Sequence, residues 1–245
     1  NTQVDWEIVE FIGSPGTDNE IVVRNVNTLQ FNNSTLSSTG TVLSNVVSNS
    51  DVVVFVTGVS NRNTSRNYYA GQVTSEWDVG LQAPIFRRGA NGASIIDVSY
   101  AVVEFIGPNW NVQRIQHAYT AAGVTETESI TAVNSLARTF LHVQKRMGAT
   151  TNVVHYGHEV WLSSIGAISF KLETGASVAV EQTSVAWVIE NIQTGVGDMN
   201  VQRSNGLTTG GTAPLALSVN LVTPMEATNN SSISANTSAA GAATN

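Results

Sequence analysis

The chain has 245 residues, of which 42% are hydrophobic and only 12% are charged, and its formal net charge is −7 at pH 7. An acidic chain with few Lys and Arg lacks the clustered cations that binding to nucleic-acid phosphates requires, so nucleic acid is excluded as an expected partner. No stretch reaches the roughly 20 apolar residues of a membrane-spanning helix. Because the chain contains no cysteine, packing and backbone pairing must stabilise its fold.

The composition favours strands over helices. Asn, Ser, Thr, Val, Ala and Gly take the share that charged residues usually hold. The β-branched residues Val, Ile and Thr pack well on a pleated surface, and Asn and Gly suit the tight turns between strands. We therefore expect an all-β fold.

Three similar segments recur along the chain. Residues 6–13 (WEIVEFIG) resemble residues 100–107 (YAVVEFIG) and, more weakly, residues 186–192 (AWVIENI). Each segment is a strand-like run followed by a turn. Each also carries a glutamate at the corresponding place, namely Glu10, Glu104 and Glu190. The spacing of roughly 90 residues is the size of one small β-sandwich.

A second predicted strand, ending in arginine, follows each of these segments. The three are Ile21 to Arg24, Asn111 to Arg114 and Asn200 to Arg203, and the last two share the sequence NVQR. We interpret the pattern as tandem antiparallel β-sandwich repeats, Ig-like or jelly-roll-like. The expected organisation is an N-terminal strand segment (1–21), a first repeat (22–107), a second repeat (108–192), a C-terminal strand segment (193–225) and an Asn/Ser/Thr-rich low-complexity tail (226–245).

Apolar runs and alternation within the two repeats predict strands at residues 51–57, 138–144 and 167–172. The run Val52 to Val56 is apolar throughout, which is typical of a strand that is buried on both faces. The one helical alternative lies at residues 130–146, where Thr and Val lower the helix propensity.

The most enzyme-like string is HYGHE, which contains His155, His158 and Glu159. Its spacing does not suit a zinc site, because residues i and i+3 of a strand point to opposite faces. The chain has no GxSxG motif, no phosphate loop and no GxGxxG motif. We therefore expect a protein that is not an enzyme and that has no metal site and no cofactor.

The recurring Glu and Arg residues are interpreted as cross-strand ion pairs, because a structural pair is needed in every repeat, whereas a catalytic site is assembled once. Among the tryptophans, Trp110 follows the turn GPN and is the one expected at the surface, while most of the others are expected in the core. Six sequons are candidate glycosylation sites: Asn32, Asn33, Asn63, Asn229, Asn230 and Asn236.

The two ends of the chain contain strands that the repeats leave unmatched. These strands are candidates for pairing between subunits, and their residues are Trp6, Ile8, Val9, Phe11, Val201, Ala216, Val219 and Leu221. Head-to-tail pairing of unlike ends gives open filaments or rings. The alternative is that both ends fold back within one chain to form a single larger sandwich.

Tandem β repeats with little charge, no cysteine and Asn/Ser/Thr-rich ends resemble the general pattern of extracellular fibre subunits and virion surface proteins. The expected function is that of a non-enzymatic structural subunit of an extracellular filament, shell or virion-surface assembly. Its expected location is extracellular, at a cell or virion surface, and its expected partner is a further copy of itself. The alternative function is a carbohydrate-binding adhesin or lectin-like module, whose partners are glycans.

Overall fold

A computed structural model describes residues 7–11, 16–61, 68–90, 95–148, 157–176, 178, 181–192 and 199–203, and for residues 7–11, 61, 68 and 199–203 it describes the backbone alone. Within these residues the protein is all-β, as the composition predicts. The helices of this part of the chain are single 3-10 turns, and none of them is long and apolar enough to cross a membrane.

The elements fall into two successive sets, which we call the first half and the second half. The first half consists of β2 (Ile21–Phe31), β3 (Ser37–Thr39), η1 (Asn49–Asp51), β4 (Val52–Asn61), η2 (Tyr68–Gly71), β5 (Val73–Asp78), β6 (Ala83–Arg88) and β7 (Ile96–Phe105). The second half consists of β8 (Trp110–Ala118), β9 (Thr125–Ser129), η3 (Leu136–Arg138), β10 (Thr139–Met147), β11 (His158–Ser164), β12 (Ala167–Leu172) and β13 (Gln182–Asn191). The terminal strands are β1 (Glu7–Phe11) and β14 (Met199–Arg203).

Each half contains two antiparallel three-stranded sheets, and the strand orders of the two halves correspond. The first half has the orders β2-β7-β4 and β3-β6-β5, and the second half has the orders β8-β13-β10 and β9-β12-β11. The last strand of each half, β7 or β13, therefore lies at the centre of a sheet and is hydrogen-bonded on both sides. The strands β1 and β14 form a separate two-stranded sheet.

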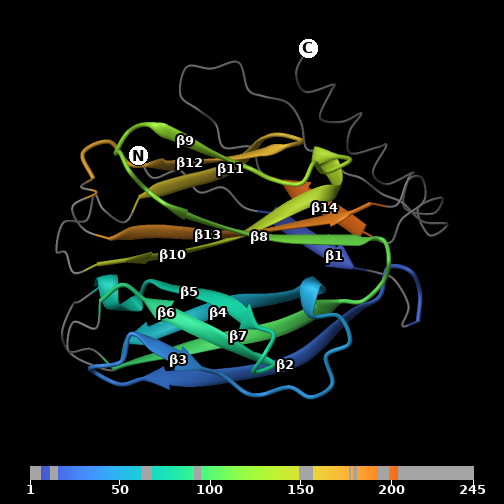
Figure 1. Cartoon of the computed structure of the whole chain (residues 1–245), viewed down its shortest axis with the longest axis horizontal. Coiled ribbons are helices and arrows are strands. Elements are labelled where there is room, and N and C mark those ends of the chain that lie inside the picture. The colour runs from blue at the N-terminus through green and yellow to red at the C-terminus, as the bar shows by residue number, and fades with distance from the viewer. Residues whose placement is uncertain are drawn as a thin grey trace, which may run out of the picture.

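The sheet β8-β13-β10 lies in the middle of the molecule, between the first half and the sheet β9-β12-β11 (Figure 1). Successive side chains of a strand point to opposite faces. Val185, Trp187 and Ile189 of β13 therefore join the core of the first half, while Ala186 and Val188 pack against the side chains of β12. Burial of one such large apolar side chain stabilises the fold by about 2 kcal/mol. The two halves thus share one hydrophobic cluster, and a second cluster lies between β13 and β12 within the second half.

The strands expected at residues 51–57, 138–144 and 167–172 are confirmed as β4, β10 and β12. Residues 139–147 form a strand, so the helix considered at residues 130–146 is wrong. The hydrophobic run of β4 is buried on both faces at Val52, Val53 and Val54, whereas Phe55 and Val56 are half-buried.

The expectation for Trp110 is wrong. Its side chain is only 6% exposed, and its ring meets the ring of Phe105 edge-on at 5.0 Å between centroids. The turn that precedes Trp110 brings the start of β8 over the end of β7, so that the indole fills the core between the halves. The exposed tryptophan of the described residues is Trp161 on β11, at 36%.

Candidate functional site

Glu104, the penultimate residue of β7, is a buried carboxylate that anchors a loop. Its side chain is 0% exposed. Its Oε1 accepts hydrogen bonds from the backbone N–H groups of Val47, at 2.7 Å, and of Ser48. Its Oε2 accepts a charge-assisted hydrogen bond from Nε of Arg24 at 2.6 Å. Glu104 therefore holds the start of η1 against the sheet β2-β7-β4.

Glu190, the penultimate residue of β13, repeats this arrangement in the second half. It is also 0% exposed. Its Oε1 accepts hydrogen bonds from the backbone N–H groups of Asn134, at 2.5 Å, and of Ser135, at 3.0 Å, at the start of η3. Its Oε2 accepts one from Nδ2 of Asn111 at 3.3 Å. The prediction that Glu104 and Glu190 are equivalent is confirmed by these contacts.

The predicted cross-strand ion pair is confirmed for Glu104 and wrong for Glu190. Arg24 lies at a shift of register in β2, between Val23 and Asn25, and this irregularity accompanies its ion pair with Glu104. β8 has no such shift, and Arg114 lies opposite Trp187, with its guanidinium over the indole ring at 5.7 Å. An arginine at a similar place in the sequence therefore points to a different partner.

The two ends of the chain meet in the sheet β1-β14. In this sheet Glu10 lies opposite Asn200, just as Glu190 lies opposite Asn111 in the sheet of the second half. The expected strand residues Ile8, Val9 and Phe11 belong to β1, and Val201 belongs to β14. Trp6, Ala216, Val219 and Leu221 lie outside the described residues. In this structure of one chain the ends pair with one another, which is the arrangement of the fold-back alternative.

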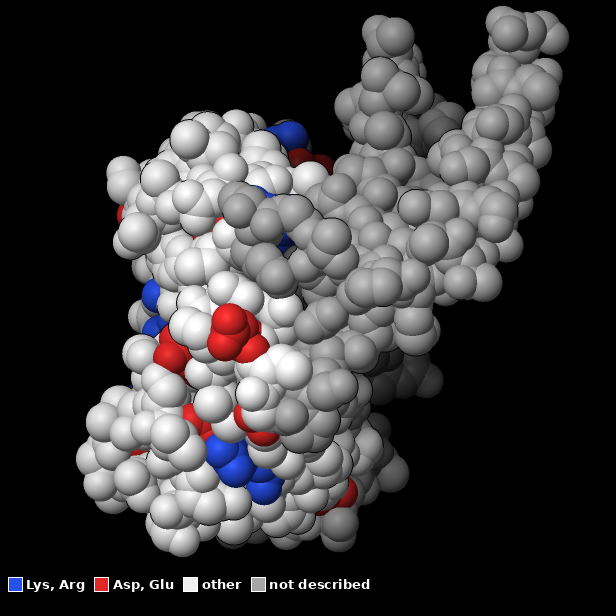
Figure 2. Space-filling view, turned by 90° about the vertical axis from the view of Figure 1, so that its right-hand side faces the viewer, with Lys and Arg blue, Asp and Glu red and all other residues white. Residues whose placement is uncertain are grey.

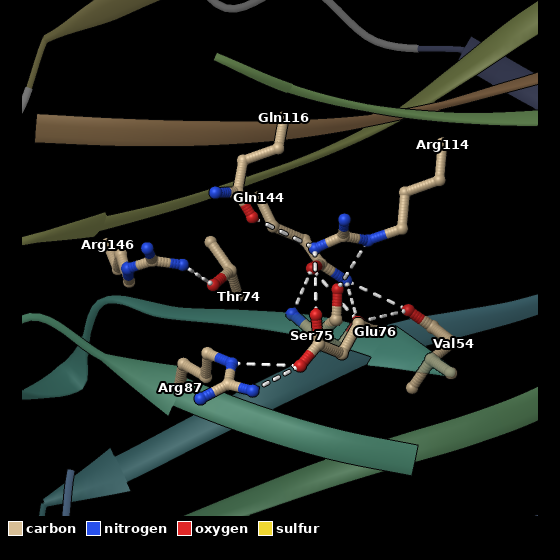
Figure 3. Close-up of polar contacts among 9 residues, drawn as sticks. All are labelled: Val54, Thr74, Ser75, Glu76, Arg87, Arg114, Gln116, Gln144 and Arg146. Carbon is tan, nitrogen blue, oxygen red and sulfur yellow. Dashed lines mark hydrogen bonds and ion pairs between the residues drawn. The ribbon is translucent and has the colours of Figure 1, made fainter. Parts of the chain in front are cut away.

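A polar network joins the two halves where β10 crosses β4 and β5 (Figure 3). Its centre is Gln144, which is 5% exposed. Its Oε1 accepts hydrogen bonds from the backbone N–H of Ser75 at 2.6 Å and from the Ser75 hydroxyl at 2.9 Å. Its Nε2 donates to the carbonyl oxygen of Val54 at 2.8 Å. The orientation of the Gln144 amide is decided by Ser75, because a backbone N–H can only donate.

The same amide decides the protonation of His142. Nε2 of Gln144 lies 3.0 Å from Nε2 of His142, so the ring nitrogen must accept this hydrogen bond. The imidazole packs on Phe55 of the first half at 4.7 Å between ring centroids. Burial lowers the pKa of His142 to about 4, which agrees with a neutral ring in the junction.

Arginines surround this junction on the outer side of β5. Glu76 forms two hydrogen bonds with Arg87, at 2.8 and 2.6 Å, and lies 3.8 Å from Nη2 of Arg114. Arg146 donates to Oγ1 of Thr74 at 3.0 Å. Burial lowers the pKa of Arg114; the charge of Glu76 opposes this change, and repulsion from Arg146 and Arg87 adds to it.

A histidine held by two carboxylates lies in the second half. Nδ1 of His117 is 2.9 Å from Glu128 and Nε2 is 2.9 Å from Glu126, so each ring nitrogen lies within hydrogen-bond distance of a carboxylate. The ring stacks on Phe170 at 4.6 Å. Although burial raises it, hydrogen bonds from Thr120 and His117 hold the pKa of Glu126 below its ordinary value. The spacing of these residues offers no recognised motif, so sequence reasoning missed this group.

The remaining predicted sites are placed as follows. Asn32 and Asn33 are exposed in the turn after β2, whereas Asn63, Asn229, Asn230 and Asn236 lie outside the described residues. His158 and Glu159 lie on β11, and His155 lies outside the described residues. Within the described part of the chain, no group of three or more His, Asp or Glu side chains could hold a metal ion.

Comparison of the chain with models of protein families, with curated proteins and with solved structures found no match. The function must therefore be argued from the geometry described above.

Proposed function

We propose that the protein is a non-enzymatic structural subunit of an extracellular filament, shell or virion-surface assembly, built of two tandem β-sandwich repeats. In this proposal neighbouring copies are joined because β1 of one copy pairs with β14 of the next. The observation that supports it is the register of the sheet β1-β14, which matches the pairing of β13 with β8 at the glutamate position. The two ends of the chain are thus complementary to each other.

The same backbone hydrogen bonds form whether the two strands belong to one chain or to two. The sheet β1-β14 has two strands, whereas the other described sheets have three. A two-stranded sheet is marginally stable by itself, so its strands separate at a lower cost in free energy than the central strands β7 and β13. Pairing of unlike ends between copies is heterologous, and it produces rings or open filaments.

A pair of cysteines tests whether β1 and β14 pair within or between chains. The chain has no cysteine, so Val9→Cys with Val201→Cys places the sole two thiols on directly opposite residues. If β1 of one copy pairs with β14 of the next, the double variant gives disulfide-linked ladders on a non-reducing gel, and mixing the two single variants gives covalent heterodimers. An intrachain disulfide with no ladder overturns the proposal.

The matched control is the variant with Ile189→Cys and Val112→Cys. These residues are opposite each other in β13 and β8, at the positions that correspond to Val9 and Val201. This pair must cross-link within the chain. Deletion of residues 1–13 gives a second readout: exchange predicts folded chains that no longer assemble, and fold-back predicts a lower melting temperature of a protein that was monomeric from the start.

A second candidate function, glycan binding, has support from Trp161. Its indole is exposed on β11, which is an edge strand of the sheet β9-β12-β11, and Ile165 in the adjoining turn is 54% exposed. Aromatic rings at a surface are favourable stacking partners for apolar ligand faces. A glycan array with the wild-type protein and with Trp161→Ala tests this candidate: selective binding that the substitution abolishes supports it, and an array without binding contradicts it.

A further inference from the structure

Three arginines from three different strands converge on the outer side of β5: Arg87 from β6, Arg114 from β8 and Arg146 from β10 (Figure 3). Glu76 binds Arg87 with its Oε1 and lies 3.8 Å from Arg114 with its Oε2. Arg146 reaches Thr74, and Thr74 lies directly opposite Arg87 in the pairing of β5 with β6. The three guanidinium groups thus lie around the buried Thr74 and the partly exposed Glu76.

In the second half, the strands β11 and β12, which correspond to β5 and β6, carry one cation and one carboxylate opposite each other. Lys171 occupies the place of Arg87, since each follows a fully buried phenylalanine in a six-residue strand. The residue opposite Lys171 is Glu159, and the two form an ion pair at 3.7 Å. The residue opposite Arg87 is Thr74, which is neutral. In the first half the carboxylate that binds Arg87 is Glu76, two residues further along β5, and the second half adds Arg114 and Arg146 beside it.

The carboxylates present leave part of the N–H donors of the cluster unused. Glu76 is shared by Arg87 and Arg114, and Arg146 has Glu181, whose side chain is 47% exposed. A guanidinium carries five N–H donors. Nη1 of Arg87, Nη1 of Arg114 and Nη2 of Arg146 have no hydrogen-bond acceptor among the described residues. The side chain of Arg87 is 45% exposed, that of Arg114 24% and that of Arg146 14%, so the cluster meets solvent mainly at Arg87.

We propose that Arg87, Arg114 and Arg146 form a binding site for an oxyanion of the sulfate or phosphate ester class. A tetrahedral oxyanion supplies several acceptors to planar guanidinium donors and relieves the repulsion among the three cations. On the face shown in Figure 2, charged groups form small separate patches on a largely uncharged surface. The proposal does not depend on assembly of the chain.

The test is a titration of the full-length protein with sodium sulfate, with a sulfated disaccharide and with glycerol phosphate, each against sodium chloride at constant ionic strength. The readout is the NMR signal of the Nε–H group of each arginine. Saturable shifts at Arg87, Arg114 and Arg146 are expected with at least one ester. The comparison between the sulfated disaccharide and glycerol phosphate decides which ester the site prefers. Equal responses to chloride and to all three probes overturn the proposal.

Arg87→Gln is the diagnostic variant, because the half-exposed Arg87 can be replaced without disturbing the core. Hydrogen bonds to charged groups are strong, so we expect the dissociation constant to rise about tenfold. The matched control is Lys171→Gln at the corresponding place in the second half, which must leave binding unchanged. Glu76→Gln keeps an acceptor for Arg87 but removes the competing charge, so it must tighten binding. Equal weakening in the Arg87 and Lys171 variants, or weaker binding in the Glu76 variant, overturns the proposal.

Discussion

Glu104 and Glu190 are equivalent residues in the two halves, and they differ in the partner of one oxygen. Both are fully buried, and Oε1 of each accepts hydrogen bonds from two successive backbone N–H groups. Oε2 of Glu104 meets the cation Arg24, whereas Oε2 of Glu190 meets the neutral amide of Asn111. This difference allows the structural role of the carboxylate to be separated from its charge.

Substitution of the two glutamates by glutamine is expected to have unequal effects. Glu190→Gln keeps an acceptor for Asn134 and Ser135, and the Asn111 amide can turn to accept from the new NH2 group. Glu104→Gln directs an NH2 group at Arg24 and leaves that largely buried cation without its carboxylate. We expect Glu104→Gln to lower the free energy of unfolding by about 3 kcal/mol and Glu190→Gln by about 1 kcal/mol. Urea denaturation of both variants checks this order, and equal losses would contradict it.

The junction between the halves is expected to weaken in acid because of His142. Its folded-state pKa of about 4 lies below the ordinary value of 6.5, so the unfolded chain binds the proton first as the pH falls. The stabilising effect of the neutral ring is complete above pH 6.5 and is lost between pH 6.5 and 4. Within this window each pH unit costs about 1.4 kcal/mol. His142→Phe, which copies Phe55 in the first half, should lack this slope, so the difference in unfolding free energy between the wild-type protein and the variant should change by this amount with each pH unit.

Gly107 is expected to tolerate no side chain. A Cβ atom at this position would lie 1.9 Å from the backbone oxygen of Asp18. The connection before β2 and the connection between β7 and β8 meet here, so neither backbone can yield without breaking the hydrogen bond from Gly107 to Glu20. Gly107→Ala should therefore lower the free energy of unfolding by about 3 kcal/mol or more. Gly166→Ala, which meets nothing within 4 Å, is the control, and both melting temperatures are measured.

Trp110, the first residue of β8, and Trp161 on β11 are expected to contribute differently to the stability of the fold. Trp110 fills the core between the halves, so Trp110→Ala should cost about 3 to 5 kcal/mol. Trp161→Ala removes a partly exposed ring and should cost under about 1 kcal/mol. Chemical denaturation measures both values. A larger loss for the Trp161 variant would contradict the burial described here.

Local features of the sequence were enough to predict the all-β fold, the strands β4, β10 and β12, and the equivalence of Glu104 and Glu190. The reason is that alternation, turn residues and recurring strings act over a few neighbouring positions, and a strand reports its burial through its own side chains. The same reasoning does not extend to pairs of residues on different strands. Arg24 and Arg114 end similar strings, but a single shift of register gives them different partners.

Only the tertiary structure decided which faces and edges of the sheets meet. In the folded chain Trp110 packs against Phe105 at the end of β7, and Ser75 and His142 orient the Gln144 amide. Three arginines, Arg87, Arg114 and Arg146, lie around Thr74 and Glu76. These contacts join residues that are far apart in the chain, and each depends on how the two halves pack. The composition and periodicity of the sequence determine which segments are strands. The packing of one half on the other determines which polar side chains face each other, because that geometry is a property of the assembled core and not of any one strand.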